Sequence, residues 1–261
     1  MATQAQYPTA TSVDEFADNI AAVRSRIAAA AQRAGRDASQ VRLLPVSKTV
    51  PEERIRLAVR AGCTELGENK VQEAERKYDN LSDLDVSWAV IGHLQTNKAK
   101  DVARFAGEFQ ALDRLRVAEK LERRLQAEGR GLDVYVQVNT SAEESKFGLP
   151  PEDVAEFLSR LPQYSALRVR GLMTLAVFSS DVEQVRPCFT QLRDLRDRVR
   201  EIDPDLIGPG ELSMGMSGDY ETAIDEGADV VRVGQAIFGA RAVPDSHYWP
   251  GGGGSAEAAR E

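Results

Sequence analysis

Short apolar runs alternate with amphipathic stretches along most of the chain. The runs have the length and composition of buried strands, and the stretches between them repeat apolar residues at helical spacing. We expect strands at 42–48, 64–68, 87–94, 108–113, 132–139, 169–176, 211–215 and 230–238. Eight strands alternating with helices are typical of a (β/α)8 barrel, although an open doubly wound sheet produces the same alternation.

The ends of the chain lack this alternation. An amphipathic stretch at 13–34, ended by Gly35, precedes the first strand and predicts an extra N-terminal helix. Residues 1–12 are small and polar, and 244–261 contain a glycine-rich stretch, so both are predicted to be disordered tails. The expected fold is therefore α/β, a single (β/α)8 TIM barrel over residues 13–243 with an extra N-terminal helix.

Composition narrows the functional classes. The 261 residues are 42% apolar and 28% charged, which is typical of a globular protein with one sizeable core. The formal charge of −8 argues against binding nucleic acid or an anionic membrane through bulk electrostatics. The only cysteines are Cys63 and Cys188 and the only histidines are His93 and His247, which excludes a disulfide framework and a multi-histidine metal site.

The sequence contains no recognisable targeting signal or membrane span. Its first residues have neither the basic nor the apolar region of a secretory signal. No stretch approaches about 18 uninterrupted apolar residues. No predicted strand or helix has an additional apolar face that a subunit interface would need to cover. We therefore expect a cytoplasmic monomer that acts as an enzyme or as a binding protein.

The first predicted strand ends in a lysine that can carry chemistry. Leu44, Val46 and Lys48 share one face of this strand. If that face points into the barrel, the Leu44 and Val46 side chains fill the barrel interior and the Lys48 amine lies at the opening of the barrel. A desolvated amine there can form a Schiff base with a carbonyl compound. The alternative is an ordinary lysine that extends to water at the end of a strand.

The last predicted strand carries an arginine on the face opposite its valines. Arg232 shares this face with Gly234. An inward guanidinium is costly unless an acid or a ligand pairs with it. An internal salt bridge to Glu65 or Glu211 and a bound ligand are both open.

Other polar residues at strand ends have a structural and a functional interpretation. Tyr135, Gln137 and Asn139 share one face of the fifth strand. If they point inward, they contact a ligand or form a structural hydrogen-bond layer. His93 follows the third strand with no evident acid beside it, which favours a histidine at the barrel rim over an acid/base group.

The loops after the last two strands can hold a phosphate group. Ser217 and Gly218 follow the strand at 211–215, and Gly234 lies in the neighbouring loop. Barrels commonly bind phosphate in these two loops through amide N–H groups. Ser217 alone is a natural helix N-cap, but together with Gly234 it favours a phosphate site.

Seven ordered sequence blocks carry a resemblance to a known family. They are PVSKTVP (45–51), GENKVQE (67–73), IGHLQTNK (91–98), VQVNTSAEESKFG (136–148), RGLMTL (170–175), LSMGMSGDYETAI (212–224) and VRVGQAIFGAR (231–241). On these blocks the chain closely resembles the pyridoxal phosphate homeostasis proteins, the YggS/PROSC-like family. The resemblance implies a barrel of the alanine-racemase type (PLP fold type III) that holds pyridoxal 5′-phosphate (PLP).

The resemblance also implies roles for individual residues. Lys48 matches the lysine that forms a covalent imine with PLP, and Arg232 matches the arginine that faces the pyridine nitrogen. The positions near the ring are Asn69 and Met216. The positions around the phosphate are Ser217, Gly218, Gly234 and Gln235. Many relatives have Thr or Ser in place of Gln235, so at this position only the backbone N–H is expected to contact the phosphate.

The implied function is that of a carrier. An arginine at the ring nitrogen disfavours protonation of that nitrogen, which makes the ring a poorer electron sink. The resemblance accordingly implies a protein of intracellular PLP and amino-acid homeostasis without strong catalysis. Its expected partners are PLP, apo forms of PLP enzymes and free amino acids, with no catalytic residue and no metal.

Two enzymatic alternatives remain. An amino-acid racemase would need a second domain with an opposing acid/base group, and the chain ends soon after the eighth predicted strand. A Schiff-base aldolase would explain Lys48 and the phosphate loops but not the ordered blocks. The carrier is therefore the favoured prediction.

Overall fold

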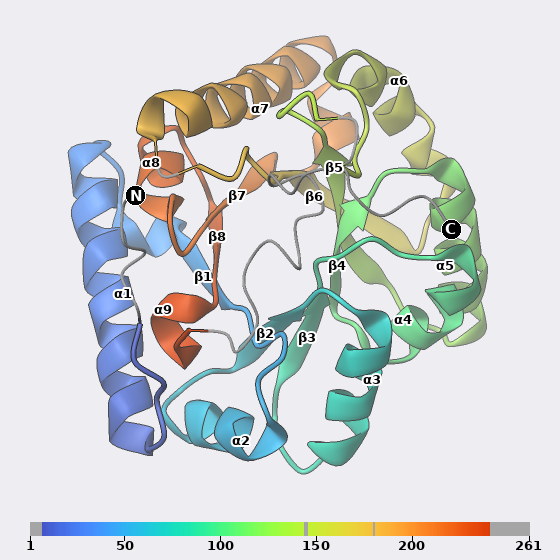
Figure 1. Cartoon of the computed structure of the whole chain (residues 1–261). Helices are drawn as coiled ribbons and strands as arrows, with labels where there is room; N and C mark the ends of the chain where they lie inside the picture. The colour runs from blue at the N-terminus through green and yellow to red at the C-terminus, as the bar shows by residue number, and fades with distance from the viewer. Residues whose placement is uncertain (1–6, 144–145, 180, 241–261) are drawn as a thin grey trace, which may run out of the picture.

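Eight parallel strands form the centre of the protein. The computed structural model describes residues 7–143, 146–179 and 181–240. Its strands are β1 (Arg42–Pro45), β2 (Glu65–Glu68), β3 (Ser87–Val90), β4 (Glu108–Leu112), β5 (Leu132–Val138), β6 (Leu167–Thr174), β7 (Glu211–Met216) and β8 (Val230–Val233). They pair in the order β1-β8-β7-β6-β5-β4-β3-β2 and curl into a near-closed barrel (Figure 1). The predicted (β/α)8 fold is thus confirmed over the open doubly wound sheet.

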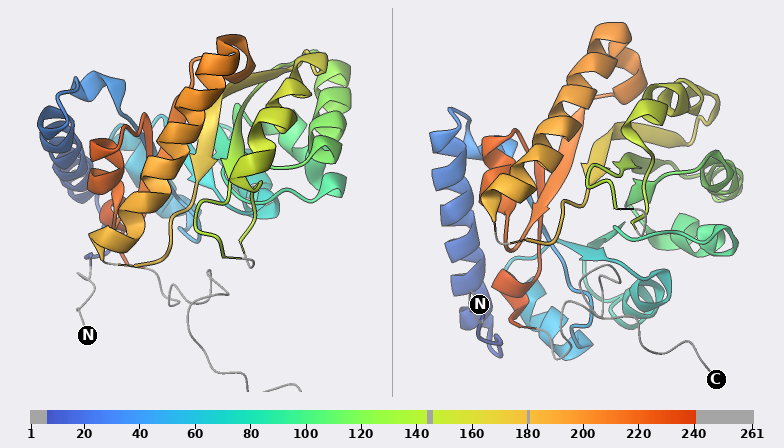
Figure 2. Two further views of the ribbon diagram at one scale, coloured as in Figure 1. Left: turned by 90° about the horizontal axis from the view of Figure 1, so that it is seen from above. Right: turned by 45° about the horizontal axis from the view of Figure 1, so that its top comes forward.

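Helices surround this barrel on its outside (Figure 2). They are α1 (Val13–Arg33), α2 (Glu52–Arg60), α3 (Val71–Asn80), α4 (Ala99–Phe105), α5 (Leu115–Ala127), α6 (Val154–Ser159), α7 (Val182–Ile202), α8 (Tyr220–Asp225) and α9 (Gln235–Phe238). Pro187 lies inside α7 and does not start it. Both faces of the strands are covered, which explains why they appear in the sequence as nearly continuous apolar runs.

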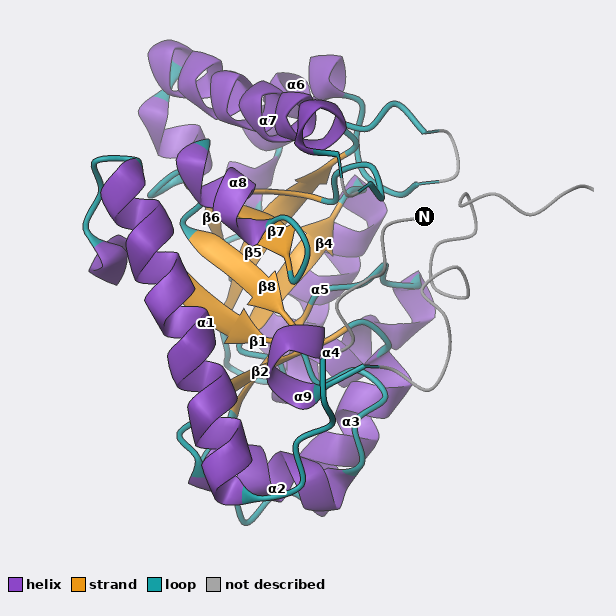
Figure 3. Cartoon of the chain, turned by 60° about the vertical axis from the view of Figure 1, so that its left-hand side comes forward, coloured by secondary structure: helices purple, strands orange, loops and turns teal. Residues whose placement is uncertain are grey.

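The extra N-terminal helix α1 packs against α2, α8 and α9 (Figure 3). Ser12 and Glu15 form a reciprocal capping box at its start. Its buried face consists of Phe16, Ile20, Val23, Ile27, Ala30 and Ala31. Gly35 follows the helix with φ of 67°, a left-handed conformation that glycine adopts at little cost. The predicted helix and its end are therefore confirmed.

The segment before α1 differs from the predicted disordered tail. Ala10 is only 2% exposed, and the Ala240 N–H donates to the Tyr7 carbonyl oxygen at 3.0 Å. Tyr7 and Ala10 thus contact the rest of the protein, while the other residues of 7–12 are exposed. Residues 1–6 and 241–261, which include the predicted C-terminal tail, lie outside the described residues.

The barrel closes between β1 and β2 with very little backbone pairing. A single bridge joins Val46 to Gly67, just beyond the end of β1. The Ser47 N–H donates to the Gly67 carbonyl oxygen at 3.0 Å. We call this junction the seam of the barrel, and it lies directly before Lys48 in the chain.

Charged side chains fill the amino-terminal end of the barrel. Arg42 pairs with Glu65 at 2.9 Å. Glu211 pairs with Arg170 at 2.6 Å and accepts a hydrogen bond from the Tyr135 hydroxyl. These interactions satisfy the inward polar groups with protein partners. They support the structural interpretation of the polar face of β5.

Candidate cofactor-binding site

A cavity of about 370 Å³ lies at the carboxyl ends of the strands. Cavities of this size and place hold small molecules in many barrels. The eight residues singled out from the sequence all line it: Lys48, Asn69, Met216, Ser217, Gly218, Arg232, Gly234 and Gln235. The ends of β1, β2, β7 and β8 therefore meet where the sequence predicted a common site.

Lys48 lies in a turn after β1, not in the strand that was predicted to extend to it. The Val50 N–H donates to the Ser47 carbonyl oxygen at 2.9 Å, which closes this turn. Thr49 has φ of 66°, a left-handed conformation that is uncommon for a β-branched residue. Val46 and Lys48 both line the cavity, which favours the inward-facing interpretation of Lys48.

A buried ionic cluster stabilises this turn through hydrogen bonds to its backbone. Lys77, on α3, has a fully buried side chain. Its Nζ donates to the Ser47 carbonyl oxygen at 2.8 Å, to Glu68 Oε1 at 2.7 Å and to Glu73 Oε1 at 2.7 Å. Burial raises the pKa of Glu68, against the opposing effect of Lys77. We call Ser47, Glu68, Glu73 and Lys77 the Lys77 cluster.

The Lys77 cluster holds the peptide groups on both sides of Lys48. The Ser47 carbonyl binds Lys77, and the Thr49 N–H donates to Glu73 Oε1 at 2.7 Å. An ammonium ion has three donors, and here all three have acceptors. The hydrogen bond to Glu73 also stabilises the uncommon backbone conformation of Thr49. The cluster was not predicted, because Glu73 and Lys77 have the spacing of an exposed helical ion pair.

Ser217 connects the two loops that were predicted to bind phosphate. The Gly234 N–H donates to Ser217 Oγ at 3.2 Å. Ser217 is not the helix N-cap that the sequence also allowed, because α8 starts at Tyr220 and Asp219 occupies the cap position. The hydroxyl and the amide therefore lie together at the cavity wall.

The two glycines of these loops are in different surroundings. A Cβ atom added to Gly234 would lie 3.0 Å from the Val46 carbonyl oxygen, so the backbones approach closely there. A Cβ added to Gly218 would meet no protein atom within 4 Å, although Gly218 lines the cavity. Protein packing therefore leaves space for a side chain at Gly218.

Arg232 is buried without a carboxylate partner. It is 3% exposed and donates to Ser213 Oγ at 2.6 Å and to the Thr174 carbonyl oxygen at 2.7 Å. Among the described residues, no carboxylate oxygen lies within 4.0 Å of its guanidinium group. The salt bridge to Glu65 or Glu211, one of the two alternatives left open by the sequence, does not form, because both acids bind other arginines at the far end of the barrel.

Burial also changes the titration of Arg232 and of a nearby acid. Burial lowers the pKa of Arg232 to about 10, although Asp219 opposes this shift. Burial raises the pKa of Asp219, whose Oδ1 accepts from the Met216 N–H at 2.5 Å. With a pKa near 10, the guanidinium is still cationic at neutral pH. The cavity wall therefore contains a fixed positive charge.

His93 lies at the rim of the cavity, as the sequence favoured, but with partners that were not expected. Its ring stacks on Phe147 with centroids 3.7 Å apart, and its Nε2 lies 3.0 Å from Arg114 Nη2. Asp113, at the end of β4, places Oδ2 3.7 Å from His93 Nδ1. Burial and the Arg114 charge lower the pKa of His93. It is therefore neutral at pH 7.

An apolar part of the cavity was missed by the sequence reasoning. It consists of Val46, Ile91, Phe147, Leu175, Val177 and Phe178. Phe147 and Phe178 are 55% and 52% exposed. The signal was available in the run from Leu175 to Phe178, which continues the apolar pattern of β6 beyond the end of that strand. Such a wall can pack against the flat face of an aromatic ligand.

Two negative findings apply to the parts of the chain that the structure describes. They contain no cluster of His, Cys, Asp or Glu side chains suited to a metal ion. None of their helices is both long and apolar enough to cross a membrane.

Comparison with known proteins identifies the family. The model of the alanine racemase N-terminal domain matches residues 19–242. A pyridoxal phosphate homeostasis protein of Aquifex aeolicus is 41% identical over 225 residues, which cover 86% of this chain and 97% of that protein.

Solved structures agree with this assignment. PipY of Synechococcus elongatus, solved with PLP bound, has a TM-score of 0.76 and 34% identity, and the match covers 86% of this chain and 100% of PipY. An alanine racemase from Streptomyces lavendulae shares the fold alone, with a TM-score of 0.69, 17% identity, and coverage of 90% of this chain and 59% of the racemase. The chain belongs to the pyridoxal phosphate homeostasis protein family, which is built on the barrel of the alanine racemase N-terminal domain.

Proposed function

We propose that the chain binds PLP in the cavity at the carboxyl ends of the strands, as an imine with Lys48, and takes part in PLP and amino-acid homeostasis. One observation carries the proposal: Lys48 and the Ser217–Gly234 pair line the same cavity. An amine and a phosphate-binding loop are the two features that PLP requires. The PLP bound to the related PipY supports PLP as the ligand.

Different residues of the cavity contact the phosphate and the ring of PLP. The Ser217 hydroxyl and the amides of Gly218, Gly234 and Gln235 bind the phosphate, and the open space beside Gly218 accommodates it. The ring packs against Asn69 and Met216, which lie in the wall of the same cavity. When bound, PLP supplies an aldehyde that condenses with the Lys48 amine and releases water.

Arg232 accounts for the proposed lack of strong catalysis. It is cationic, buried and without a carboxylate within 4.0 Å among the described residues. Facing the pyridine nitrogen, it repels a proton on that atom. A ring that stays unprotonated stabilises a carbanion poorly, so turnover of amino acids is slow. No residue is assigned a catalytic role in this proposal.

The remaining parts of the proposal concern the surroundings of the protein. We propose a cytoplasmic monomer that exchanges PLP with apo forms of PLP enzymes and meets free amino acids. PLP is its only cofactor, and it needs no metal. The composition and net charge of −8 support a role without nucleic acid or membranes.

The imine is tested by spectroscopy and trapping. PLP is added to the apoprotein, the visible imine band is recorded, and borohydride reduction is followed by mass mapping of the modified lysine. Lys48→Ala should lose both the band and the adduct. Lys70→Ala is the matched control, because Lys70 lines the same cavity. A full adduct on Lys70 or another lysine in Lys48→Ala would overturn the assignment.

Catalysis is tested on the PLP-loaded protein. Racemisation and transamination of alanine and several other amino acids are measured at steady state. The carrier function predicts spectral shifts without appreciable product. A turnover near the enzyme median of about 10 per second would instead support a racemase.

A further inference from the structure

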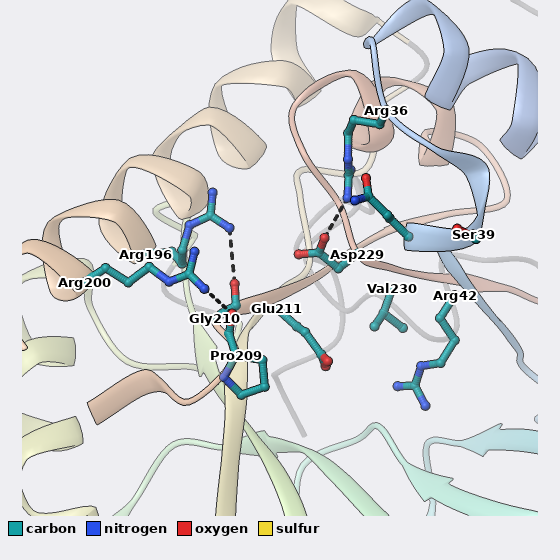
Figure 4. Close-up of a pocket in the computed structure, with 11 residues that line it drawn as sticks. Arg36, Ser39, Arg42, Arg196, Arg200, Pro209, Gly210, Glu211, Asp229 and Val230 are labelled. Atoms are coloured by element: carbon teal, nitrogen blue, oxygen red, sulfur yellow. Dashed lines mark hydrogen bonds and ion pairs between the residues drawn. The ribbon is translucent and has the colours of Figure 1, made fainter. Parts of the chain in front are cut away.

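A second cavity, whose lining residues are drawn in Figure 4, lies at the amino-terminal end of the barrel, opposite the cavity that Lys48 lines. It has a volume of about 490 Å³ and reaches the first residues of β1, β7 and β8. The basic residues in its wall are Arg36, Arg42, Arg196 and Arg200. Only two acids line it, Glu211 and Asp229. The wall is therefore cationic in a chain that is acidic overall.

Two of the four arginines are neutralised within the protein. Arg42 binds Glu65 and Glu108 at 2.9 and 2.7 Å. Arg36 binds Asp229 at 2.6 Å, as Figure 4 shows. The excess positive charge of the cavity therefore comes from the other two arginines, on α7.

Arg196 and Arg200 extend toward the same loop. They lie one helical turn apart, and like charges at this spacing destabilise a helix. Arg196 donates to the Gly210 carbonyl oxygen at 3.2 Å, and Arg200 donates to the Pro209 carbonyl oxygen. Carbonyl oxygens fix the direction of a guanidinium group without neutralising its charge. Figure 4 shows both groups held side by side against this loop.

Within the described part of the chain, neither guanidinium has a buried carboxylate within 4.0 Å, although Asp229 attracts Arg196 from a greater distance. Arg196 also binds Asp197, but the Asp197 side chain is 52% exposed, so water screens this pair. Arg200 has no carboxylate oxygen within 4.0 Å among the residues that the structure describes. Each guanidinium carries five N–H donors, and most of them are not used by the contacts above.

The backbone of the loop at Gly210 allows the Arg200 side chain to approach closely. Gly210 has φ of 70°. A Cβ atom at this position would lie 2.7 Å from Arg200 Nε and 2.8 Å from its Cζ. The guanidinium group of Arg200 therefore lies directly against the Gly210 backbone.

We propose that this second cavity binds a small phosphate-bearing anion, held by Arg196 and Arg200. Planar guanidinium groups bind phosphate oxygens through two parallel hydrogen bonds, and the pair would compensate an anion of two or more charges. The cavity exceeds the size of one phosphate group, so a diphosphate or a phosphate ester fits better than inorganic phosphate. This site is independent of the proposed PLP site.

The test is calorimetric titration of the whole protein with pyrophosphate, with inorganic phosphate and citrate as comparison anions. Pyrophosphate should bind with a sub-millimolar dissociation constant, more tightly than either comparison anion. One equivalent of PLP, fixed at Lys48 by borohydride reduction with the excess removed, should leave this constant unchanged, because Lys48 lies at the other end of the barrel. Loss of pyrophosphate binding in that loaded protein, or tighter binding of citrate, would overturn the proposal.

Variants locate the site. Arg196→Gln/Arg200→Gln should weaken pyrophosphate binding by about tenfold or more, since two charged hydrogen-bonding groups are lost. The control Arg116→Gln/Arg123→Gln removes the same charge from exposed positions of α5 and should have no such effect. Equal weakening in both would indicate bulk electrostatics and refute the site.

A second double variant separates the effect of the charge from that of the planar guanidinium group. Arg196→Lys/Arg200→Lys keeps both charges but loses the planar groups, so binding should be intermediate. Binding as tight as in the unmodified protein would refute the assignment to the guanidinium groups. Circular dichroism melting curves report whether each variant is folded.

Discussion

Replacing Lys77 by methionine tests whether the Lys77 cluster stabilises the fold and the Lys48 turn. Methionine has a similar length but no charge, so Lys77→Met removes three hydrogen bonds from a fully buried site. It leaves the carboxyl of Glu68 buried without its ammonium partner. Breaking a buried ion pair in this way costs about 3–5 kcal/mol. We expect the free energy of unfolding at pH 7 to fall by about that amount.

The loss of unfolding free energy in Lys77→Met should depend on pH in a defined direction. Burial raises the pKa of Glu68 above its usual 4.5, and removing Lys77 raises it further. A carboxyl with a raised pKa in the folded state favours folding when it is protonated. This contribution is fully present below about 4.5 and is lost as the pH rises through the folded-state pKa. The difference between Lys77→Met and the unmodified protein should therefore be smaller at pH 5 than at pH 7.5.

Urea denaturation followed by circular dichroism measures both effects. The double variant Lys77→Met/Glu68→Gln removes the orphaned charge and should recover part of the lost stability. A loss below about 1 kcal/mol at pH 7.5 would refute the reasoning, because such a value is typical of an exposed pair. A double variant no more stable than Lys77→Met, or a loss that grows toward pH 5, would also refute it.

The Lys48 turn provides a second measurement on the same variant. Lys77→Met should also weaken PLP binding, because the Ser47 carbonyl loses its partner beside Lys48. Glu122→Gln is a matched control: Glu122 is buried and accepts from the Ala166 N–H at 2.8 Å, far from the cavity residues. Equal weakening of PLP binding in both variants would indicate a general loss of stability.

Three further predictions concern the cavity. Ser217→Ala should weaken PLP binding by about tenfold or more, since a hydrogen bond to a charged group contributes about 1.5–3 kcal/mol; unchanged affinity in a spectroscopic titration would exclude the hydroxyl. Gly218→Val should weaken PLP binding while the melting temperature of the apoprotein stays the same, because the added atoms enter open space; a lower melting temperature with normal affinity would contradict this. The imidazole of His93 should titrate below 6.5 by NMR, owing to burial and to Arg114, and Arg114→Gln should raise its midpoint; a midpoint at or above 6.5 would be inconsistent with the structure.

The positions of the strands could be predicted from the sequence, but their ends could not. Parallel strands covered on both faces appear as apolar runs, so all eight were recognisable. The apolar and polar pattern alone suggested that the first strand extends to Lys48. It ends earlier because the Val50 N–H and the Lys77 cluster bind the backbone on either side of Lys48. Contacts between distant segments decide such an end.

The members of the site were predictable, but several of their partners were not. Family blocks identified the residues around the cavity, since each block lies at the end of a strand. Serine commonly caps helices, yet Ser217 does not cap α8, which starts at Tyr220. Its Oγ accepts a hydrogen bond from the Gly234 N–H. Arg232 has neutral partners on β7 and β6 in place of the expected acids. Such pairings depend on which strands become neighbours when the barrel closes.

The seam between β1 and β2 has a consequence for the way the native protein opens. In the described residues, the backbone pairing between these strands consists of one bridge with the hydrogen bond from Ser47 to Gly67, while the Lys77 cluster connects them through side chains. Partial unfolding proceeds through the parts of a structure that cost the least to separate. The seam is such a part, so the amide hydrogen of Ser47, which donates to the Gly67 carbonyl oxygen, should exchange through a sub-global opening and not through complete unfolding. Because Lys48 follows directly, each opening would expose the imine proposed there to water, which would link the lifetime of the bound cofactor to the fluctuations of the barrel.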